Sequence, residues 1–320
     1  MPANILVVGA MIPSLMEALE QAFTVHKLWL MPDQSAFLRE HGPEIQGLVT
    51  SYIYGADTHL LKNLPSLEMI ASYGVGTDRI DMAQALERQI MVTNTPDINE
   101  PVADMALALL LAVTRRLCEA DRFVKSGQWP KQTFPFGVNL GKKLCGIVGL
   151  GRIGRAIAKR AEAFGMKIAY YGPRQKTDVP YSYYDDLRQL ALDSDFLVLA
   201  LPGGVETQHL IDDDILEALG PNGYLINVAR GSVLDESALI RRLQSGQLAG
   251  AGLDVFEHEP VSDSPLMHME QVVLAPHIAS ATVETRHEMG DVVMANLRAY
   301  FSQQPVLTPV TPVQSVSLKH

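Results

Sequence analysis

Apolar and polar positions alternate in blocks along almost the whole chain. Short apolar runs, typical of buried strands, are separated by amphipathic stretches that are typical of helices. Strands separated by helices predict parallel sheets covered on both faces. In the N-terminal part we expect strands at residues 4–8, 26–30, 47–50, 68–72 and 91–93, with helices at 14–22, 35–41 and 82–89.

A long helical pattern at residues 101–126 separates this series from a second one. Pro101 suits the first turn of a helix, and Ser126-Gly127 suits its end. The second series predicts a dinucleotide-binding sheet, which uses six strands of this kind. The strands are expected at residues 143–148, 167–171, 196–200, 223–227, 249–254 and 272–275, and the helices at 152–164, 185–192, 213–219 and 236–245. A further helix at 283–302 carries the chain back out of this series.

The order of the two series predicts an α/β protein in which one domain is inserted into another. Residues 1–98 together with 286–320 form the outer domain, and residues 99–285 form the inner, dinucleotide-binding domain. Both are expected to be doubly wound parallel sheets. Because ligands bind at the carboxyl ends of the strands in such sheets, polar residues that follow the strands are the candidates for function.

Composition narrows the classes of function. The chain has 320 residues, of which 47% are hydrophobic and 19% charged, a usual mixture for a globular protein. Its net charge of −10, with no basic stripe, disfavours nucleic-acid binding. No apolar run reaches the roughly 18–20 residues that span a bilayer, and the start shows no signal-peptide pattern. Two cysteines, Cys118 and Cys145, are too few for a metal cluster or a disulfide framework. We therefore expect a cytoplasmic protein that has no metal site and binds neither a membrane nor a nucleic acid.

A glycine-rich turn follows the first strand of the second series. Gly149, Gly151 and Gly154 have the G-x-G-x-x-G spacing, in which they permit a tight turn, close approach of a pyrophosphate, and close packing of helix on strand. The N–H groups and the dipole of the following helix favour the anion. The motif alone could be a structural turn, but its position between a strand and a helix favours a dinucleotide site. The expected cofactor contacts are Gly149, Leu150, Gly151, Arg152, Ile153 and Gly154.

The end of the next strand bears on which dinucleotide is bound. A site that prefers NAD places Asp or Glu there to accept a hydrogen bond from the ribose 2′-OH. Here the chain reads Gly172-Pro173-Arg174-Gln175-Lys176, without an acid. An arginine fork can bind a 2′-phosphate, so we expect the protein to bind NADP(H), and NAD(H) at lower affinity. Arg174 is expected to be the main contact to the phosphate, and Lys176 a weaker one. The alternative is that Arg174 is a solvated loop charge.

Polar residues follow three later strands. Arg230 follows the strand at 223–227, Glu259 the strand at 249–254, and His277 the strand at 272–275. An arginine fork can hold a 2-keto acid, and a histidine can protonate the alkoxide that hydride addition leaves. A carboxylate beside the histidine would hold the ring in place. Singly, these residues could be a salt-bridge residue, a loop acid and a strand-end cap; together, beside a dinucleotide turn, they indicate a catalytic set.

A series of ordered motifs then covers nearly the whole chain. They are Ser72-Tyr73-Gly74-Val75-Gly76-Thr77-Asp78, Val102-Ala103-Asp104, the glycine turn, Val228-Ala229-Arg230-Gly231, Gly252-Leu253-Asp254-Val255-Phe256, Glu259-Pro260 and Pro276-His277. With these motifs the chain resembles the D-2-hydroxyacid dehydrogenase family. Residues 115–122 and 282–286 make it most similar to glyoxylate/hydroxypyruvate reductases and hydroxyphenylpyruvate reductases. The resemblance implies a Rossmann domain inserted into a flavodoxin-like substrate domain, and NADPH-dependent reduction of a 2-keto acid.

The resemblance also implies roles for particular residues. His277 is the general acid/base, Glu259 its partner, and Arg230 the substrate anchor. Val75 and Gly76 would offer backbone N–H groups to the substrate carboxylate. Further cofactor contacts would be Pro202, Thr207, Val228 and Asp254. A homodimer through the dinucleotide-binding domains is implied, with an arm at residues 127–140 that reaches across; its Trp129, Phe134 and Phe136 could otherwise be ordinary packing residues.

The chain departs from the family pattern in two loops, and other functions would fit the same catalytic residues. Gly203-Gly204 follows Pro202 where Leu-Thr is commoner, which is expected to leave more room beside the cofactor. The loop at residues 95–101 is one residue shorter than usual, and a threonine often found in it before the helix is absent, so the cofactor contact of that threonine is not carried over. A 2-ketogluconate or hydroxyphenylpyruvate reductase would use the same mechanism. A dinucleotide-sensing corepressor would share the Arg, Glu and His set, and turnover of NADPH distinguishes it.

Overall fold

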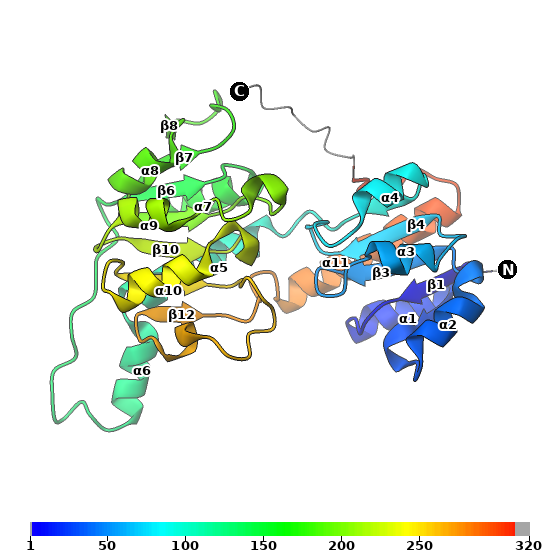
Figure 1. Ribbon diagram of the computed structural model, residues 1–320, viewed down its shortest axis with the longest axis horizontal. Helices are drawn as coiled ribbons and strands as arrows, with labels where there is room; N and C mark the ends of the chain where they lie inside the picture. Colours follow the sequence, from blue (N-terminus) through cyan, green and yellow to red (C-terminus); the bar gives the residue numbers. More distant parts are fainter. Residues whose placement is uncertain (1, 311–320) are drawn as a thin grey trace. The chain divides into compact units, whose positions relative to one another are not determined.

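The computed structural model describes residues 2–310, and the chain divides into two compact units. The first unit contains the residues up to Ile98 together with those from Thr282 onward, and the second is Asn99–Ala281. Each unit is a parallel sheet with helices on both faces (Figure 1), which confirms the predicted fold class. The chain returns to the first unit at Thr282, a few residues before the boundary expected after residue 285. Residues 311–320, which the sequence assigned to the outer domain, lie outside the described residues.

The first unit has a five-stranded sheet in the order β2-β1-β3-β4-β5, the order of flavodoxin-like folds. Its strands are β1 (Asn4–Val7), β2 (Thr24–Lys27), β3 (Gly47–Ser51), β4 (Met69–Tyr73) and β5 (Met91–Thr93). Two apolar clusters cover the two faces of this sheet. One is shared with α1 (Pro13–Ala22) and α11 (Val283–Phe301), and the other with α2 (Gln34–His41), α3 (Thr58–Lys62) and α4 (Met82–Glu87).

Aspartates start the three helices of one face. Asp33, Asp57 and Asp81 precede α2, α3 and α4, and each side chain accepts a hydrogen bond from a backbone N–H in the first turn. Such caps satisfy amides that have no partner within the helix. They fix where each helix leaves the loop that follows its strand, and those loops lie at the carboxyl edge of the sheet.

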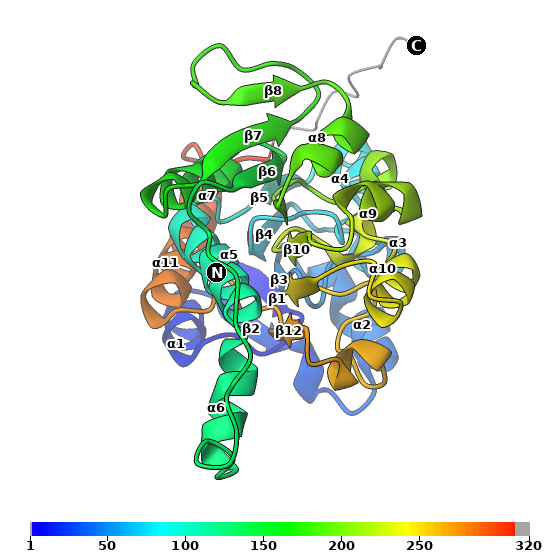
Figure 2. The ribbon, with the colours of Figure 1, turned by 90° about the vertical axis from the view of Figure 1, so that its left-hand side faces the viewer.

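The second unit has a seven-stranded sheet in the order β12-β11-β10-β9-β6-β7-β8. Its strands are β6 (Leu144–Val148), β7 (Lys167–Tyr171), β8 (Ser182–Tyr184), β9 (Phe196–Leu199), β10 (Tyr224–Asn227), β11 (Gly250–Leu253) and β12 (Val272–Leu274). Helices α5 (Asn99–Thr114) and α7 (Arg152–Ala163) cover one face; α8 (Leu187–Asp193), α9 (Asp213–Leu219) and α10 (Glu236–Gln244) cover the other (Figure 2). Six strands match the predicted series, and β8 is an additional edge strand.

The long helix predicted at residues 101–126 is wrong: the segment forms α5 and a separate α6 (Leu117–Lys125). Arg116 between them has a left-handed backbone with φ 54°, and its guanidinium pairs with Glu119. The carbonyl of Thr114 accepts the N–H of Val138, at 2.8 Å, instead of continuing the helix. A contact with a residue far along the chain thus ends α5, and Figure 2 shows α6 extending away from the sheet.

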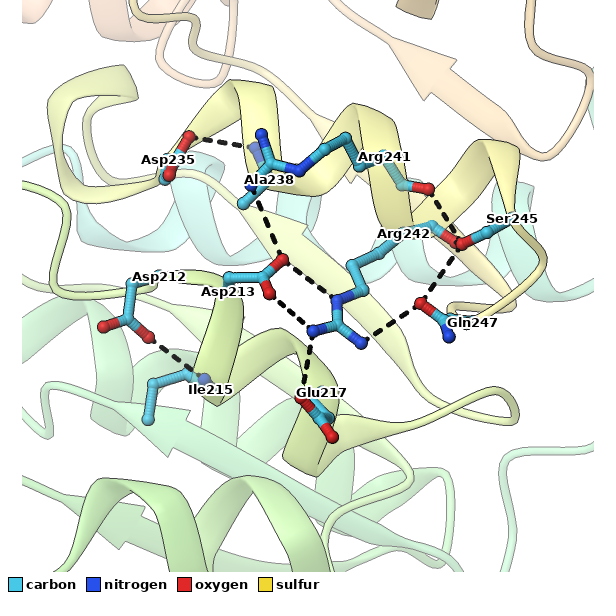
Figure 3. Close-up of polar contacts among 10 residues, drawn as sticks. All are labelled: Asp212, Asp213, Ile215, Glu217, Asp235, Ala238, Arg241, Arg242, Ser245 and Gln247. Atoms are coloured by element: carbon cyan, nitrogen blue, oxygen red, sulfur yellow. Dashed lines mark hydrogen bonds and ion pairs between the residues drawn. The ribbon is translucent and has the colours of Figure 1, made fainter.

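A cluster of ion pairs joins α9 to α10 in the second unit (Figure 3). Arg242 of α10 bonds both carboxylate oxygens of Asp213, at 3.0 and 2.5 Å, and also Glu217, at 3.0 Å. The guanidinium of Arg242 holds the pKa of Asp213 below its usual range. Asp212 and Asp235 cap the two helices through the N–H groups of Ile215 and Ala238. Together these bonds fix the helices that flank β10, the strand preceding Arg230.

Within residues 2–310, no helix has the length and apolar character that a membrane span requires. The same residues contain no cluster of three or more side chains able to hold a metal ion.

Candidate active site

The three predicted catalytic residues lie at the carboxyl edge of the second sheet. β10, β11 and β12 are neighbours, with Asn227 paired to Leu253 and Leu253 to Leu274. Arg230, Glu259 and His277 all lie in the segments that follow these strand ends. In a parallel sheet the segments after adjacent strands meet at one edge, where ligands bind.

His277 and Glu259 form a direct pair. The His277 Nδ1 lies 2.8 Å from Glu259 Oε2, and each side chain is 20% exposed. The other oxygen of Glu259 accepts the N–H of Phe256 at 3.0 Å, so the carboxylate is held from two sides. An ionised carboxylate accepts only, so Nδ1 carries the proton and Nε2 is the nitrogen that can exchange a proton with a ligand.

The backbone around His277 is held by Asp254. This fully buried carboxylate accepts the N–H groups of Ile278 and Ala279 at 2.8 and 2.9 Å, and the Asp254 carbonyl accepts the N–H of His277 at 2.8 Å. Burial raises the pKa of Asp254. His277 itself has a positive φ of 55°, a conformation that non-glycine residues adopt only where the surroundings hold it. Asp254 therefore fixes the loop that carries the histidine.

A second histidine–glutamate pair, which the sequence did not indicate, has its glutamate on the loop that carries Glu259. His209 Nε2 is 2.9 Å from Glu257 Oε1, and the N–H of Glu257 donates to Glu236 at 3.1 Å. His209 follows the turn at residues 202–207, and Glu257 is close in sequence to Glu259. The pair connects the turn expected to line the cofactor with the loop that carries Glu259. In the sequence, Glu257 stands two residues before Glu259, but nothing there points to His209 as its partner.

Arg230 lies beside the Gly203-Gly204 turn. Its Nη1 donates to the carbonyl of Ala229 at 2.7 Å. A Cβ added to Gly203 would lie 3.0 Å from the Arg230 Cγ, whereas a Cβ on Gly204 would meet nothing within 4 Å. The stem of Arg230 thus occupies part of the space expected beside this turn. Thr207 closes the turn, because its hydroxyl donates a hydrogen bond to the carbonyl of Pro202 at 3.0 Å.

The glycine turn between β6 and α7 has the geometry of a phosphate-binding site. Gly149 has φ 97°, and a Cβ on Gly154 would overlap the carbonyl oxygen of Gly149. A Cβ on Gly151 would meet nothing within 4 Å, so this glycine faces open space. Among the described residues, the N–H groups of residues 151–154 have no acceptor. Such amides at a helix N-terminus attract an anion, so this turn fits a dinucleotide pyrophosphate.

The end of β7 has room for a phosphate. Gly172 follows the strand directly, and a Cβ there would meet nothing within 4 Å. The side chain of Arg174 is exposed in the loop that follows. The nearest carboxylate along this loop, Asp178, is paired with Arg155 at 2.9 Å. The loop thus presents a cation and no unpaired acid at the place where dinucleotide sites distinguish the 2′ substituent of the ribose.

Val75 and Gly76 belong to the first unit, in the segment after β4. The Val75 carbonyl accepts the side-chain amide of Asn94 at 2.8 Å, which fixes this segment. Within the described part of the chain, the backbone N–H groups of Val75 and Gly76 have no acceptor. They therefore remain available as hydrogen-bond donors.

The arm at residues 127–140 carries three aromatic side chains of different exposure. Phe134 packs on Phe123 of α6, with ring centroids 5.2 Å apart, and the Arg116 guanidinium lies over its ring. Phe136 is 97% exposed and Trp129 is 67% exposed. Phe134 is thus a packing residue of the arm, whereas Trp129 and Phe136 are exposed on it.

Comparisons with known proteins agree with this geometry. Residues 107–279 match the profile of the D-isomer specific 2-hydroxyacid dehydrogenase, NAD binding domain. A glyoxylate/hydroxypyruvate reductase A of Arabidopsis thaliana is 48% identical over 91% of this chain and 94% of its own length. A hydroxyphenylpyruvate reductase of Plectranthus scutellarioides is 44% identical over 96% and 98%. Among solved structures, an NADPH-dependent glyoxylate/hydroxypyruvate reductase of Sinorhizobium meliloti in complex with NADP and malonate has a TM-score of 0.89 at 40% identity, covering 97% of each chain.

Proposed function

Because this chain belongs to the D-isomer specific 2-hydroxyacid dehydrogenases, a family of oxidoreductases with an NAD-binding domain, we propose that it uses NADPH to reduce a 2-keto acid of the glyoxylate/hydroxypyruvate class to the D-2-hydroxy acid. The observation that carries this proposal is the His277–Glu259 pair, at 2.8 Å, on the sheet that also carries the glycine turn. The pair supplies a positioned proton, and the turn fits the pyrophosphate of the cofactor.

The proposed reaction assigns one task to each residue. The Arg230 guanidinium holds the substrate carboxylate and carbonyl, with the Val75 and Gly76 amides as further donors to the carboxylate. The bound nicotinamide supplies the hydride. His277 donates a proton from Nε2 to the developing alkoxide, and Glu259 keeps the ring in the tautomer and orientation that this needs. Val228 and Asp254 would lie near the nicotinamide and its ribose in this arrangement, and Pro202 and Thr207 would line the cofactor.

The preference for NADPH is supported by the loop after β7. It contains Arg174 and Lys176, and no acid stands at residues 172–176 to accept from a ribose 2′-OH. A 2′-phosphate would gain charge-assisted bonds from Arg174. The similar Sinorhizobium meliloti enzyme is described as NADPH-dependent. NAD(H) would bind at lower affinity, since only the contacts to the 2′ substituent differ.

The side chain of the substrate distinguishes among enzymes that share this reaction. Relatives named as glyoxylate/hydroxypyruvate and hydroxyphenylpyruvate reductases both match nearly the whole chain. The mechanism acts on the carboxylate and carbonyl that these keto acids share. A hydroxyphenylpyruvate or 2-ketogluconate reductase is therefore the alternative, with the same catalytic residues and a larger side-chain pocket.

The proposal extends to organisation and location. The second unit binds the dinucleotide, and the first unit is the substrate domain. The protein forms a cytoplasmic homodimer through the second units, with the exposed Trp129 and Phe136 of the arm covered by the other copy. Burial of such aromatic side chains is a common source of interface stability.

A keto-acid panel with both cofactors tests the proposed function. Initial rates with glyoxylate, hydroxypyruvate, hydroxyphenylpyruvate and 2-ketogluconate are measured with NADPH and with NADH. We expect the highest kcat/KM with NADPH and one of the first two acids. Absence of turnover with every acid would favour a dinucleotide-sensing role instead, and preference for a larger acid would favour the alternative reductase.

Substitution of Arg174 tests the cofactor preference separately. Arg174→Ala should raise the KM for NADPH about ten- to hundredfold, as expected for loss of a charge-assisted bond, and leave the KM for NADH nearly unchanged. Arg188→Ala is the matched control, because Arg188 is an exposed arginine on α8 in the same unit. A wild-type preference for NADH, or an Arg174→Ala variant that binds NADPH normally, contradicts the assignment.

A further inference from the structure

The loop at residues 172–181 carries Arg174 and connects β7 to β8, two parallel strands. Parallel neighbours need a crossover connection that returns the chain from the end of one strand to the start of the next, usually through a helix. Here β7 and β8 are paired in parallel, and no helix lies between them. A loop without helical hydrogen bonds is expected to be mobile unless side chains hold it. A mobile arginine would lose conformational entropy each time it bound a phosphate.

The middle of the loop is held by a buried hydroxyl. Tyr170 lies on β7 with its residue 1% exposed, and its ring packs on Tyr183 with centroids 5.4 Å apart. The Tyr170 hydroxyl oxygen accepts the backbone N–H of Lys176 at 2.6 Å. A hydrogen bond shielded from water is stronger than an exposed one. The core of the sheet therefore fixes the chain just beyond Arg174.

Other side chains hold the loop on both sides of this point. The Tyr183 hydroxyl donates to the carbonyl of Gly172 at 3.1 Å, at the start of the loop. Arg155 of α7 pairs with Asp178 at 2.9 Å, and the Tyr181 hydroxyl donates to Glu162 of the same helix at 2.8 Å. Asp178 is 66% exposed, so its ion pair is expected to contribute less than the buried bond.

We propose that Tyr170 is a positioning residue for cofactor selection: through the amide of Lys176 it holds the β7–β8 loop in the conformation in which Arg174 meets the 2′-phosphate of the dinucleotide. This inference rests on the proposed use of NADPH. It adds a residue that does not touch the cofactor and acts only on the phosphate-bearing form. Preorganisation of the loop lowers the entropy lost when Arg174 binds.

The test uses Tyr170→Phe, which removes one oxygen and keeps the buried ring. Binding of 2′-phospho-ADP-ribose and of ADP-ribose is measured by calorimetry, so that neither a nicotinamide nor turnover is needed. We expect the Kd of the phosphorylated probe to rise about three- to tenfold, as for loss of one hydrogen bond, and that of ADP-ribose to stay within about twofold. Backbone amide exchange at residues 172–176 of the unliganded protein should become faster.

Tyr184→Phe is the matched control. Tyr184 lies on β8 beside Tyr183, but its hydroxyl donates to Asp193 of α8, at 2.9 Å, rather than to the loop. It should change neither the ratio of the two Kd values nor exchange at residues 172–176. Equal weakening of both probes in Tyr170→Phe would indicate a general structural role and overturn the inference, as would an unchanged ratio.

Failure of the proposed function gives a different result. If the wild-type protein does not bind 2′-phospho-ADP-ribose more tightly than ADP-ribose, the preference for NADPH is wrong and the inference falls with it. If the wild-type preference is present, only the variants decide. Should Tyr170→Phe fail to fold, Asp178→Ala takes its place: a smaller loss in the same direction supports the positioning of the loop, and an unchanged ratio overturns it.

Discussion

At the scale of single residues, two histidine–glutamate pairs have their glutamates on one loop and are expected to have different roles. Glu259 pairs with His277, which lies after β12 at the carboxyl edge, and Glu257 pairs with His209, which lies after the cofactor turn. Glu259 also accepts the N–H of Phe256, which fixes both of its oxygens. In the proposed reaction the first pair delivers a proton, whereas the second connects two segments.

The two pairs provide a test with its own control. Glu259→Gln keeps the length of the side chain but removes the charge that orients the His277 ring. We expect kcat to fall about ten- to hundredfold, which is less than the roughly hundred- to ten-thousandfold contribution of general acid catalysis because His277 itself remains. Glu257→Gln makes the same change on the same loop beside His209 and should lower kcat by less than about threefold. Steady-state kinetics with a saturating keto acid measures both. Equal losses in the two variants would show that the His277 pair has no special role.

At the scale of secondary-structure elements, the β6–α7 turn has one glycine that serves the fold and one that we propose serves the ligand. A side chain at Gly154 would overlap the backbone of Gly149, so this position fixes how closely the helix approaches the strand. A side chain at Gly151 would project into open space beside the unpaired amides of the helix N-terminus. The same residue type is thus required for two different physical reasons.

These reasons separate in two alanine variants. Gly154→Ala should lower the free energy of unfolding by about 1–3 kcal/mol, because backbone must shift to admit the methyl group. Gly151→Ala should leave the thermal midpoint unchanged and raise the Kd for NADPH about tenfold, which corresponds to about 1.4 kcal/mol. Differential scanning calorimetry and calorimetric titration measure the two quantities. A stable Gly154→Ala protein, or a Gly151→Ala protein with normal binding, would contradict this division.

The elements also show which parts of the fold a sequence can predict. Local patterns predicted the alternating strands and helices and the glycine turn. They also placed Arg230, Glu259 and His277 after neighbouring strands, because parallel strands bring the segments after them to one edge. The break before α6 was missed, since it depends on the Val138 amide, which lies far along the chain from Thr114. His209 with Glu257 was missed for the same reason: two residues distant in sequence meet only in the folded chain.

At the scale of the whole molecule, each of the two units has apolar clusters of its own. In the first unit, α11 follows the inserted second unit in sequence yet packs against α1 and β4, and its Leu297 is fully buried there. In the second unit, Leu225 of β10 is fully buried in a core of its own. The first unit therefore needs chain segments from both sides of the insertion, whereas the second is continuous in sequence.

Because each core lies within one unit, damage to one unit should leave the other folded. Leu297→Ala and Leu225→Ala each leave a cavity expected to cost about 2–5 kcal/mol, in the first and second unit respectively. Hydrogen exchange followed by mass spectrometry should show faster exchange in β1, β3 and β4 for Leu297→Ala, and in β9, β10 and β11 for Leu225→Ala. Addition of 2′-phospho-ADP-ribose at about 100 times its Kd should stabilise the second unit by about 2.7 kcal/mol, because the glycine turn and the β7–β8 loop both belong to that unit. The ligand should therefore restore protection from exchange in Leu225→Ala more than in Leu297→Ala. Loss of protection across both units in either variant would mean that they unfold as one.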